Sequence, residues 1–145
     1  MELKSDFFTI QKLEPESSST LKLVKSKATD DLHDLKRKIV LMDKQECVFV
    51  RLDDIVYAEA KGAYTEVHLS TKKTLIVCKN IKTFSERLPD SEFIRVHKSY
   101  IININYIEKY VKSDGGYLIL ENGKNIPVSV RKRQTLQDLV DQWAV

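Results

Sequence analysis

Short apolar segments separated by polar turns run from residue 38 to residue 128 and predict a mainly β protein. Val, Ile, Tyr and Phe dominate these segments, and such β-branched and aromatic residues favour strands. The strongest turn signals are Asp114-Gly115-Gly116 and Glu121-Asn122-Gly123, because Gly and Asn accept positive φ angles. The spacing indicates a meander of antiparallel strands. The predicted strands are residues 38–42, 47–52, 55–60, 64–69, 74–78, 93–96, 107–111, 117–120 and 125–128.

Two segments have helical spacing instead. Asn80 can cap a short helix in which Ile81, Phe84 and Leu88 share one face, and the proline that follows Leu88 ends it. A last helix begins near Ser129, and its apolar positions recur at helical intervals. These positions are Leu136, Leu139, Val140 and Trp143. The fold therefore contains small helices beside the strands.

Residues 1–36 differ in composition and are predicted to form an arm or linker. Residues 14–20 (EPESSST) are typical of a linker. Residues 28–38 have the composition of one short charged helix. Phe7-Phe8 forms an apolar pair that is suited to docking on a partner or on a second copy of the chain. Residues 37–145 form the main domain.

The composition excludes several classes of protein. Apolar residues make up 42% of the 145 residues, which is enough for a packed core. No stretch approaches the about eighteen consecutive apolar residues of a membrane-spanning helix, and the first residues lack the apolar core of a secretion signal. We expect a cytoplasmic protein without membrane insertion. Cys47 and Cys78 lie in strand-like surroundings and are expected to be buried, reduced thiols.

The sequence offers little that suggests catalysis. His33, His68 and His97 have no Cys or carboxylate partner at a usual metal-ligand spacing. Neither a phosphate-binding Gly-rich loop nor a nucleophile elbow is present in the sequence. The paired carboxylates Asp53-Asp54 lie between two strands and are typical of a turn. We therefore expect no enzyme activity, no cofactor and no metal.

Two basic segments with apolar neighbours are the features most informative about function. Residues 93–103 (FIRVHKSYIIN) contain the potentially cationic side chains of Arg95, His97 and Lys98 between apolar residues, and residues 129–133 (SVRKR) form a second basic run. A rigid cationic surface is what binding to a phosphate backbone requires, and the net charge of +3 permits such a partner. Strand alternation places Ile94 and Val96 on one face and Phe93, Arg95 and His97 on the other.

Three blocks of sequence resemble the signature blocks of the LytTR DNA-binding domain. They are residues 55–60 (IVYAEA), 93–103 (FIRVHKSYIIN) and 126–131 (IPVSVR), and the resemblance covers about residues 37–140. It implies an elongated stack of small antiparallel β-sheets with about ten strands and two or three short helices. It also implies a sequence-specific transcription regulator that reads double-stranded DNA with loops.

Carried over to this chain, the resemblance implies three DNA-contacting segments. The first is the turn Lys61-Gly62-Ala63-Tyr64, the second is centred on His97-Lys98-Ser99, and the third is the start of the last helix. Arg131 is predicted to make a bidentate guanine contact, and Lys98 to reach a phosphate or a guanine edge. The predicted DNA-contacting residues are Lys61, Tyr64, Arg95, His97, Lys98, Ser99, Ser129, Arg131, Lys132 and Arg133.

The sequence leaves plainer interpretations of these residues open. They are an exposed turn for Lys61, a core position for Tyr64, a turn-holding hydrogen bond for His97, an ion pair with Glu59 or Glu92 for Arg95, and a solvated charged turn for residues 131–133. Asn103 and Asn105 are expected to hold turn geometry.

The function also has an alternative: a protein-binding β module docked to a membrane-bound regulatory partner. The family precedent implies paired DNA sites, occupied by two protomers. Family members usually carry a receiver domain ahead of this module, and about 36 residues are too few for one. We therefore expect either a stand-alone member or a fragment.

Overall fold

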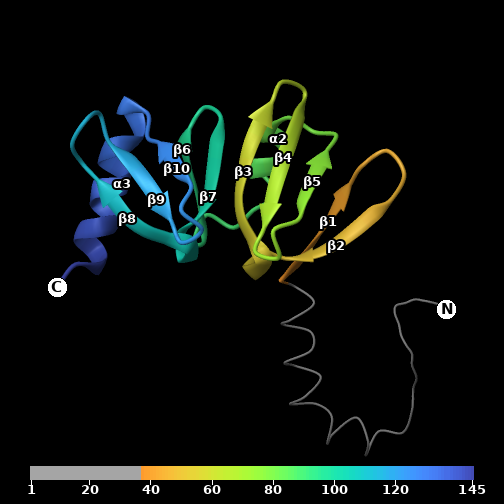
Figure 1. Cartoon of the computed structure of the whole chain (residues 1–145), viewed down its shortest axis with the longest axis horizontal. Coiled ribbons are helices and arrows are strands. Elements are labelled where there is room, and N and C mark those ends of the chain that lie inside the picture. The colour runs from red at the N-terminus through yellow and green to blue at the C-terminus, as the bar shows by residue number, and fades with distance from the viewer. Residues whose placement is uncertain (1–36) are drawn as a thin grey trace, which may run out of the picture. The chain divides into compact units, whose positions relative to one another are not determined.

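The computed structural model describes residues 37–145, and Figure 1 shows their elements. The predicted arm, most of its short helix and Phe7-Phe8 lie outside the described residues. Residues Lys38–Val145 pack as one unit. No helix within residues 37–145 is long and apolar enough to cross a membrane.

Ten strands in the described part of the chain form three antiparallel sheets. The two-stranded sheet consists of β1 (Lys38–Met42) and β2 (Cys47–Arg51). The five-stranded sheet has the order β5-β4-β3-β7-β6 and consists of β3 (Ile55–Lys61), β4 (Tyr64–Leu69), β5 (Thr74–Val77), β6 (Phe93–His97) and β7 (Tyr100–Asn103). The three-stranded sheet has the order β10-β9-β8 and consists of β8 (Ile107–Val111), β9 (Tyr117–Leu120) and β10 (Asn125–Pro127). The helices are α2 (Ile81–Ser85), α3 (Val130–Trp143) and the short 3-10 helices η1 (Leu52–Asp54) and η2 (Ile104–Tyr106).

The predicted mainly β fold is confirmed, and so is the cap of the first helix. The side-chain oxygen of Asn80 accepts a hydrogen bond from the N–H of Thr83 at 2.8 Å, which satisfies one of the free donors at the start of α2. Strand β7 was not predicted. Its Ile101 and Ile102 are both buried, one in each core, so the strand shows no apolar and polar alternation.

The central sheet is buried on both faces, and this fixes the strands that carry the basic segments. One face packs against β1, β2 and α2 through a cluster that includes Ile55, Val67, Phe84, Phe93 and Ile101. The other face packs against the three-stranded sheet and α3 through a cluster that includes Val96, Ile102, Leu118, Ile126 and Leu136. Full burial of each such side chain contributes about 1.5–3 kcal/mol. The hairpin turns at the ends of β3, β6 and β7 are therefore attached to rigid strands.

A β-bulge in β6 corrects the predicted orientation of His97. The pairing register shifts between Arg95, which lies opposite Ile101, and His97, which lies opposite Tyr100. Residues directly opposite in an antiparallel pair share a face, and the rings of His97 and Tyr100 are 5.8 Å apart. His97 therefore lies on the face of Tyr100, and its predicted place on the face of Phe93 is wrong because simple alternation does not allow for an extra residue.

The prediction of buried thiols is also wrong. Cys47 and Cys78 are both free and exposed. The β1–β2 hairpin buries only one of its faces, through Leu41 and Val50, so that Cys47 and its partner Met42 point to the opposite, open face. A strand-like sequence pattern predicts the strand but does not show which face of it is covered.

Candidate nucleic-acid interface

Main-chain hydrogen bonds bring the three predicted DNA-contacting segments together. The N–H of Ala60, at the end of β3, donates to the carbonyl of Ser99 in the β6–β7 turn at 2.8 Å. The N–H of Ser129, just before α3, donates to the carbonyl of Val96 in β6, also at 2.8 Å. The β3–β4 and β6–β7 turns consequently lie side by side (Figure 1), and the start of α3 lies on the other side of β6. The β6–β7 turn is the middle of the three segments.

The β3–β4 turn presents exposed side chains. Gly62 has a φ of 65°, a left-handed conformation that glycine adopts without strain, and nothing packs where its side chain would be. Tyr64 is 42% exposed, so a core position for this residue is excluded. The Nζ of Lys61 lies 3.4 Å from an oxygen of Glu59 and remains accessible. The turn is therefore open to a ligand.

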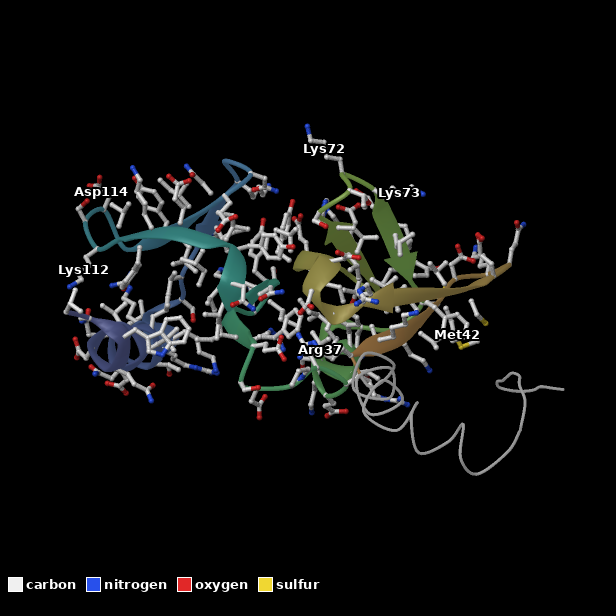
Figure 2. The ribbon with its side chains drawn as sticks, turned by 90° about the horizontal axis from the view of Figure 1, so that it is seen from below. Arg37, Met42, Lys72, Lys73, Lys112 and Asp114 are labelled. Carbon is white, nitrogen blue, oxygen red and sulfur yellow. The ribbon has the colours of Figure 1, made fainter. Side chains whose placement is uncertain are left out.

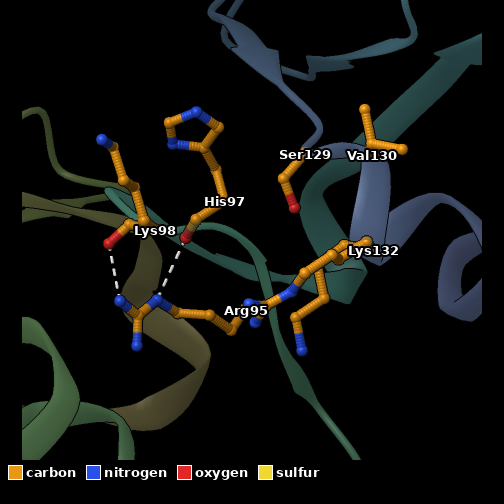
Figure 3. Close-up of a pocket in the computed structure, with 7 residues that line it drawn as sticks. Arg95, His97, Lys98, Ser129, Val130 and Lys132 are labelled. Carbon is orange, nitrogen blue, oxygen red and sulfur yellow. Dashed lines mark hydrogen bonds between the residues drawn. The ribbon is translucent and has the colours of Figure 1, made fainter.

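In the β6–β7 turn, two of the predicted residues hold the main chain (Figure 3). The Nε of Arg95 donates to the carbonyl of His97 at 3.0 Å, and its Nη2 donates to the carbonyl of Lys98 at 2.6 Å. Partial burial lowers the pKa of Arg95 from its usual range. The Nδ1 of His97 accepts a hydrogen bond from the N–H of Ser99 at 3.1 Å, so the turn-holding interpretation of His97 is confirmed.

These bonds leave Lys98 as the exposed cation at the tip of the turn. Glu59, one of the carboxylates considered for Arg95, instead contacts Lys61 and accepts a hydrogen bond from the hydroxyl of Tyr100 at 3.2 Å. The turn thus combines a fixed main chain with an exposed terminal ammonium. That combination suits a contact whose position along DNA is fixed while its reach adapts.

The first turn of α3 carries the third segment. Ser129 is the N-cap residue of α3 and has an extended backbone. Its side chain makes no capping hydrogen bond to the helix. Arg131 is exposed at the second helical position, where free N–H groups and the helix dipole favour an anion. Cations in a first turn oppose that dipole, and a bound phosphate would relieve the repulsion.

Arg133 is directed elsewhere. Its Nε is buried, and a methyl group added to Gly116 would lie 3.6 Å from that atom, so the side chain runs against the β8–β9 turn and Tyr110. The structure therefore separates Arg133 from Arg131 and Lys132, although the three residues are consecutive in the sequence. Helical periodicity explains the separation, since residues two positions apart face different directions.

A pocket of about 440 Å³ joins the second and third segments (Figure 3). Four of its lining residues are cations, and no carboxylate is among the described residues that line it. The lining residues are Arg95, His97, Lys98, Ser129, Val130, Arg131 and Lys132. Val130 is an addition to the predicted set. It is 73% exposed, and its only sequence signal is an apolar residue inside the third signature block. The arrangement offers positive charge, free N–H groups and one apolar contact.

Known proteins share both the sequence pattern and this fold. The sequence profile of the LytTr DNA-binding domain matches residues 45–141. Sensory transduction protein LytT of Bacillus subtilis (strain 168) is 30% identical over 110 residues, which cover 74% of this chain and 45% of that protein. The CO-responsive transcriptional regulator RcoM of Rhodospirillum rubrum is 28% identical over 99 residues, which cover 68% of this chain and 42% of that protein.

A solved structure is similar as well. It is the LytTr DNA-binding domain of a protein from Bacillus cereus that is described as a methyl-accepting/DNA response regulator. The TM-score is 0.62 at 26% sequence identity, and the match covers 72% of this chain and 96% of that domain. The chain spans about half the length of the full relatives it matches. On the profile match and the shared fold, the chain belongs to the LytTR family of DNA-binding domains.

Proposed function

We propose that this chain is a sequence-specific regulator of transcription that reads double-stranded DNA with three adjacent segments. The observation that carries the proposal is the cationic pocket shared by the β6–β7 turn and the start of α3, in a chain of the LytTR family. Residues 37–145 would form the DNA-binding unit and residues 1–36 an arm. This function would place the protein in the cytoplasm.

The side chains divide into four roles. Lys98 and Lys132 would pair with phosphates, which supplies affinity but no sequence information. Arg131 would make a bidentate contact with guanine, and exposed Val130 would contact a thymine methyl group. Arg95 and His97 would keep the β6–β7 turn in shape. Lys61 and Tyr64 of the neighbouring turn, together with Ser99, would extend the contact along the duplex.

The same geometry has consequences for the DNA. Contacts from neighbouring segments to successive grooves favour a curved duplex, because curvature brings more of the backbone within reach. Two protomers on paired sites would extend the readout further, as the predicted family precedent implies.

A protein-binding module docked to a membrane-bound partner is the alternative. It is not favoured, since the matched family is a DNA-binding one and relatives are named as transcriptional regulators.

The test begins with selection of bound sequences from random duplex DNA, followed by titrations of the selected duplex in rising salt. We expect Arg131→Ala to cost about 1–3 kcal/mol of binding free energy and to relax the preference at one base position. Lys98→Ala should weaken binding to all sequences and reduce the salt slope by about 0.9, the value for one phosphate contact.

Lys73→Ala is the matched control. Lys73 is exposed in the β4–β5 turn (Figure 2), at the opposite end of β4 from Tyr64, and should leave affinity and slope unchanged. Equal effects of Lys73→Ala and Lys98→Ala would contradict the assigned surface. Binding of a protein partner that is insensitive to salt, with no selected DNA sequence, would favour the docking alternative instead.

A further inference from the structure

Three side chains with metal-binding atoms converge on the central sheet, next to the proposed DNA-contacting turn. Glu59 of β3 lies directly opposite Glu66 of β4, and His68 lies two residues beyond Glu66 on the same face. One carboxylate oxygen from each Glu and one ring nitrogen of the His all lie within 4.8 Å of one another. One of these separations is 2.9 Å, between the Nε2 of His68 and an oxygen of Glu66.

Two carboxylates in this position call for a cation. Like charges directly opposite each other in a sheet are destabilising, and both groups are only partly accessible to water, with side chains 20% and 26% exposed.

The surrounding residues already hold the three side chains in place. The ring of His68 stacks on that of Tyr57, with centroids 4.2 Å apart and planes 6° from parallel. The Nδ1 of His68 lies 3.3 Å from the hydroxyl of Thr74, and the hydroxyl of Tyr100 donates to Glu59 at 3.2 Å. Histidines that bind metals usually fix their other ring nitrogen in this way, and ligating carboxylates are usually hydrogen-bonded too.

We propose that Glu59, Glu66 and His68 bind one divalent transition-metal ion, with Zn²⁺ the best match. Two carboxylates and a neutral imidazole balance the charge of the ion and leave a fourth position for water. Ligand bonds of about 2.0–2.2 Å in a tetrahedron require small shifts of the three atoms relative to one another, which rotation of the Glu side chains provides. The nitrogen ligand disfavours Mg²⁺, which prefers oxygen ligands in an octahedron.

Binding would displace one ammonium group and set the tautomer of His68. The Nζ of Lys61 now lies 3.4 Å from Glu59, and this half-exposed ion pair is weak enough for a divalent ion to replace it. The Nε2 of His68 must present its lone pair to the metal, so its proton would move to Nδ1, where the Thr74 hydroxyl can accept it. The site does not depend on DNA binding, although release of Lys61 would take place beside the proposed DNA surface.

The experiment is a calorimetric titration of the untagged full chain with Zn²⁺ alone. It uses a Cys47→Ser/Cys78→Ser background, because both thiols are exposed and bind zinc themselves. We expect one ion per chain and loss of that binding in Glu59→Gln, Glu66→Gln and His68→Gln. Tyr100→Phe should weaken binding by about tenfold, the lower limit for an outer-shell partner.

Glu108→Gln is the matched control, because Glu108 is an exposed carboxylate of β8 that lies outside the cluster. It should bind Zn²⁺ as the parent protein does. Circular dichroism would establish that each variant is folded, and the titration is interpreted only for folded variants. Absence of binding in the parent protein would overturn the proposal. Binding that survives in folded His68→Gln and Glu66→Gln would overturn it as well.

Discussion

Arg95 is a cation in the proposed DNA surface whose hydrogen bonds point into the protein. Two of its nitrogens donate to carbonyls of the β6–β7 turn, and each such bond from a charged donor contributes about 1.5–3 kcal/mol. A lysine has the same charge but cannot donate two bonds in a fixed plane. Replacing Arg95 with lysine therefore keeps the positive charge and removes the two-point hydrogen bonding, so the two contributions to DNA binding can be measured separately.

Arg95→Lys should weaken DNA binding by about tenfold or more, because the turn that carries Lys98 loses its two-point support. The salt slope should stay unchanged, since no phosphate contact is lost. Anisotropy titrations over a range of salt concentrations measure both quantities. Arg87→Lys, at an exposed position after α2, is the control that should behave as the parent protein does. A slope reduced by the value of one contact would instead make Arg95 a direct phosphate ligand.

At the scale of elements, α3 matters because its first turn presents Arg131 while its middle is anchored in the core. Leu136 is 1% exposed and packs against the three-stranded sheet and β6. Isolated helices of this length are marginal in water, so packing rather than propensity holds α3 in place. The position of Arg131 thus depends on a leucine more than a turn away.

Leu136→Ala should lower the free energy of unfolding by about 2–5 kcal/mol, since it removes buried apolar area and leaves a cavity. Urea denaturation followed by circular dichroism measures the change. Asp138→Ala is the comparison on the same helix. Its carboxylate is exposed and accepts a hydrogen bond from Gln134, so the change should stay within about 0.5 kcal/mol. A similar loss for both variants would show that α3 is not anchored through Leu136.

The sequence predicted most elements but not how they meet. Alternation and turn residues sufficed for β1 to β6 and β8 to β10, and Asn103 was correctly expected to hold a turn, where its side-chain oxygen accepts the N–H of Asn105. Strand β7 was not predicted because both of its faces are covered, so its sequence shows no alternation. The bulge at His97 was not predicted because an inserted residue does not change the composition of the strand. The direction of Arg133 required knowledge of which face of α3 is packed.

For the whole molecule, the free energy of unfolding at high pH reports on Tyr57, which lies in the core between the central sheet and the three-stranded sheet. Tyr57 is 5% exposed, and burial, followed by the nearby carboxylates, raises its pKa to about 12. A tyrosine whose pKa is higher in the folded than in the unfolded chain stabilises the fold fully below the unfolded value of about 10. That contribution is lost as the pH rises through the folded value.

The free energy of unfolding should therefore fall between pH 10 and about 12. Urea denaturation at a series of pH values measures this fall. Tyr57→Phe, which cannot ionise, should show a smaller fall over the same range. Tyr100, whose pKa is also raised by burial, accounts for part of what remains. Identical profiles for the two proteins would exclude Tyr57 as the source.

The candidate site could be predicted only in part, because it depends on contacts between residues that are far apart in the sequence. The family resemblance indicated which segments to consider, and the basic residues within them were visible. That Glu59 lies beside Glu66 and His68 depends on strand pairing, which no local pattern shows. Likewise, the neighbours of the β6–β7 turn are set by hydrogen bonds between residues far apart in the sequence.

The bonds from Ala60 to Ser99 and from Ser129 to Val96 have one more consequence, because both join peptide groups. Every amino acid except proline can make them, so exchanging the exposed side chains does not alter the distances between the three segments. New operator preferences could then arise by single replacements at Lys98, Val130 or Arg131, without a new scaffold. A library randomised at these positions should yield folded proteins that bind different DNA sequences.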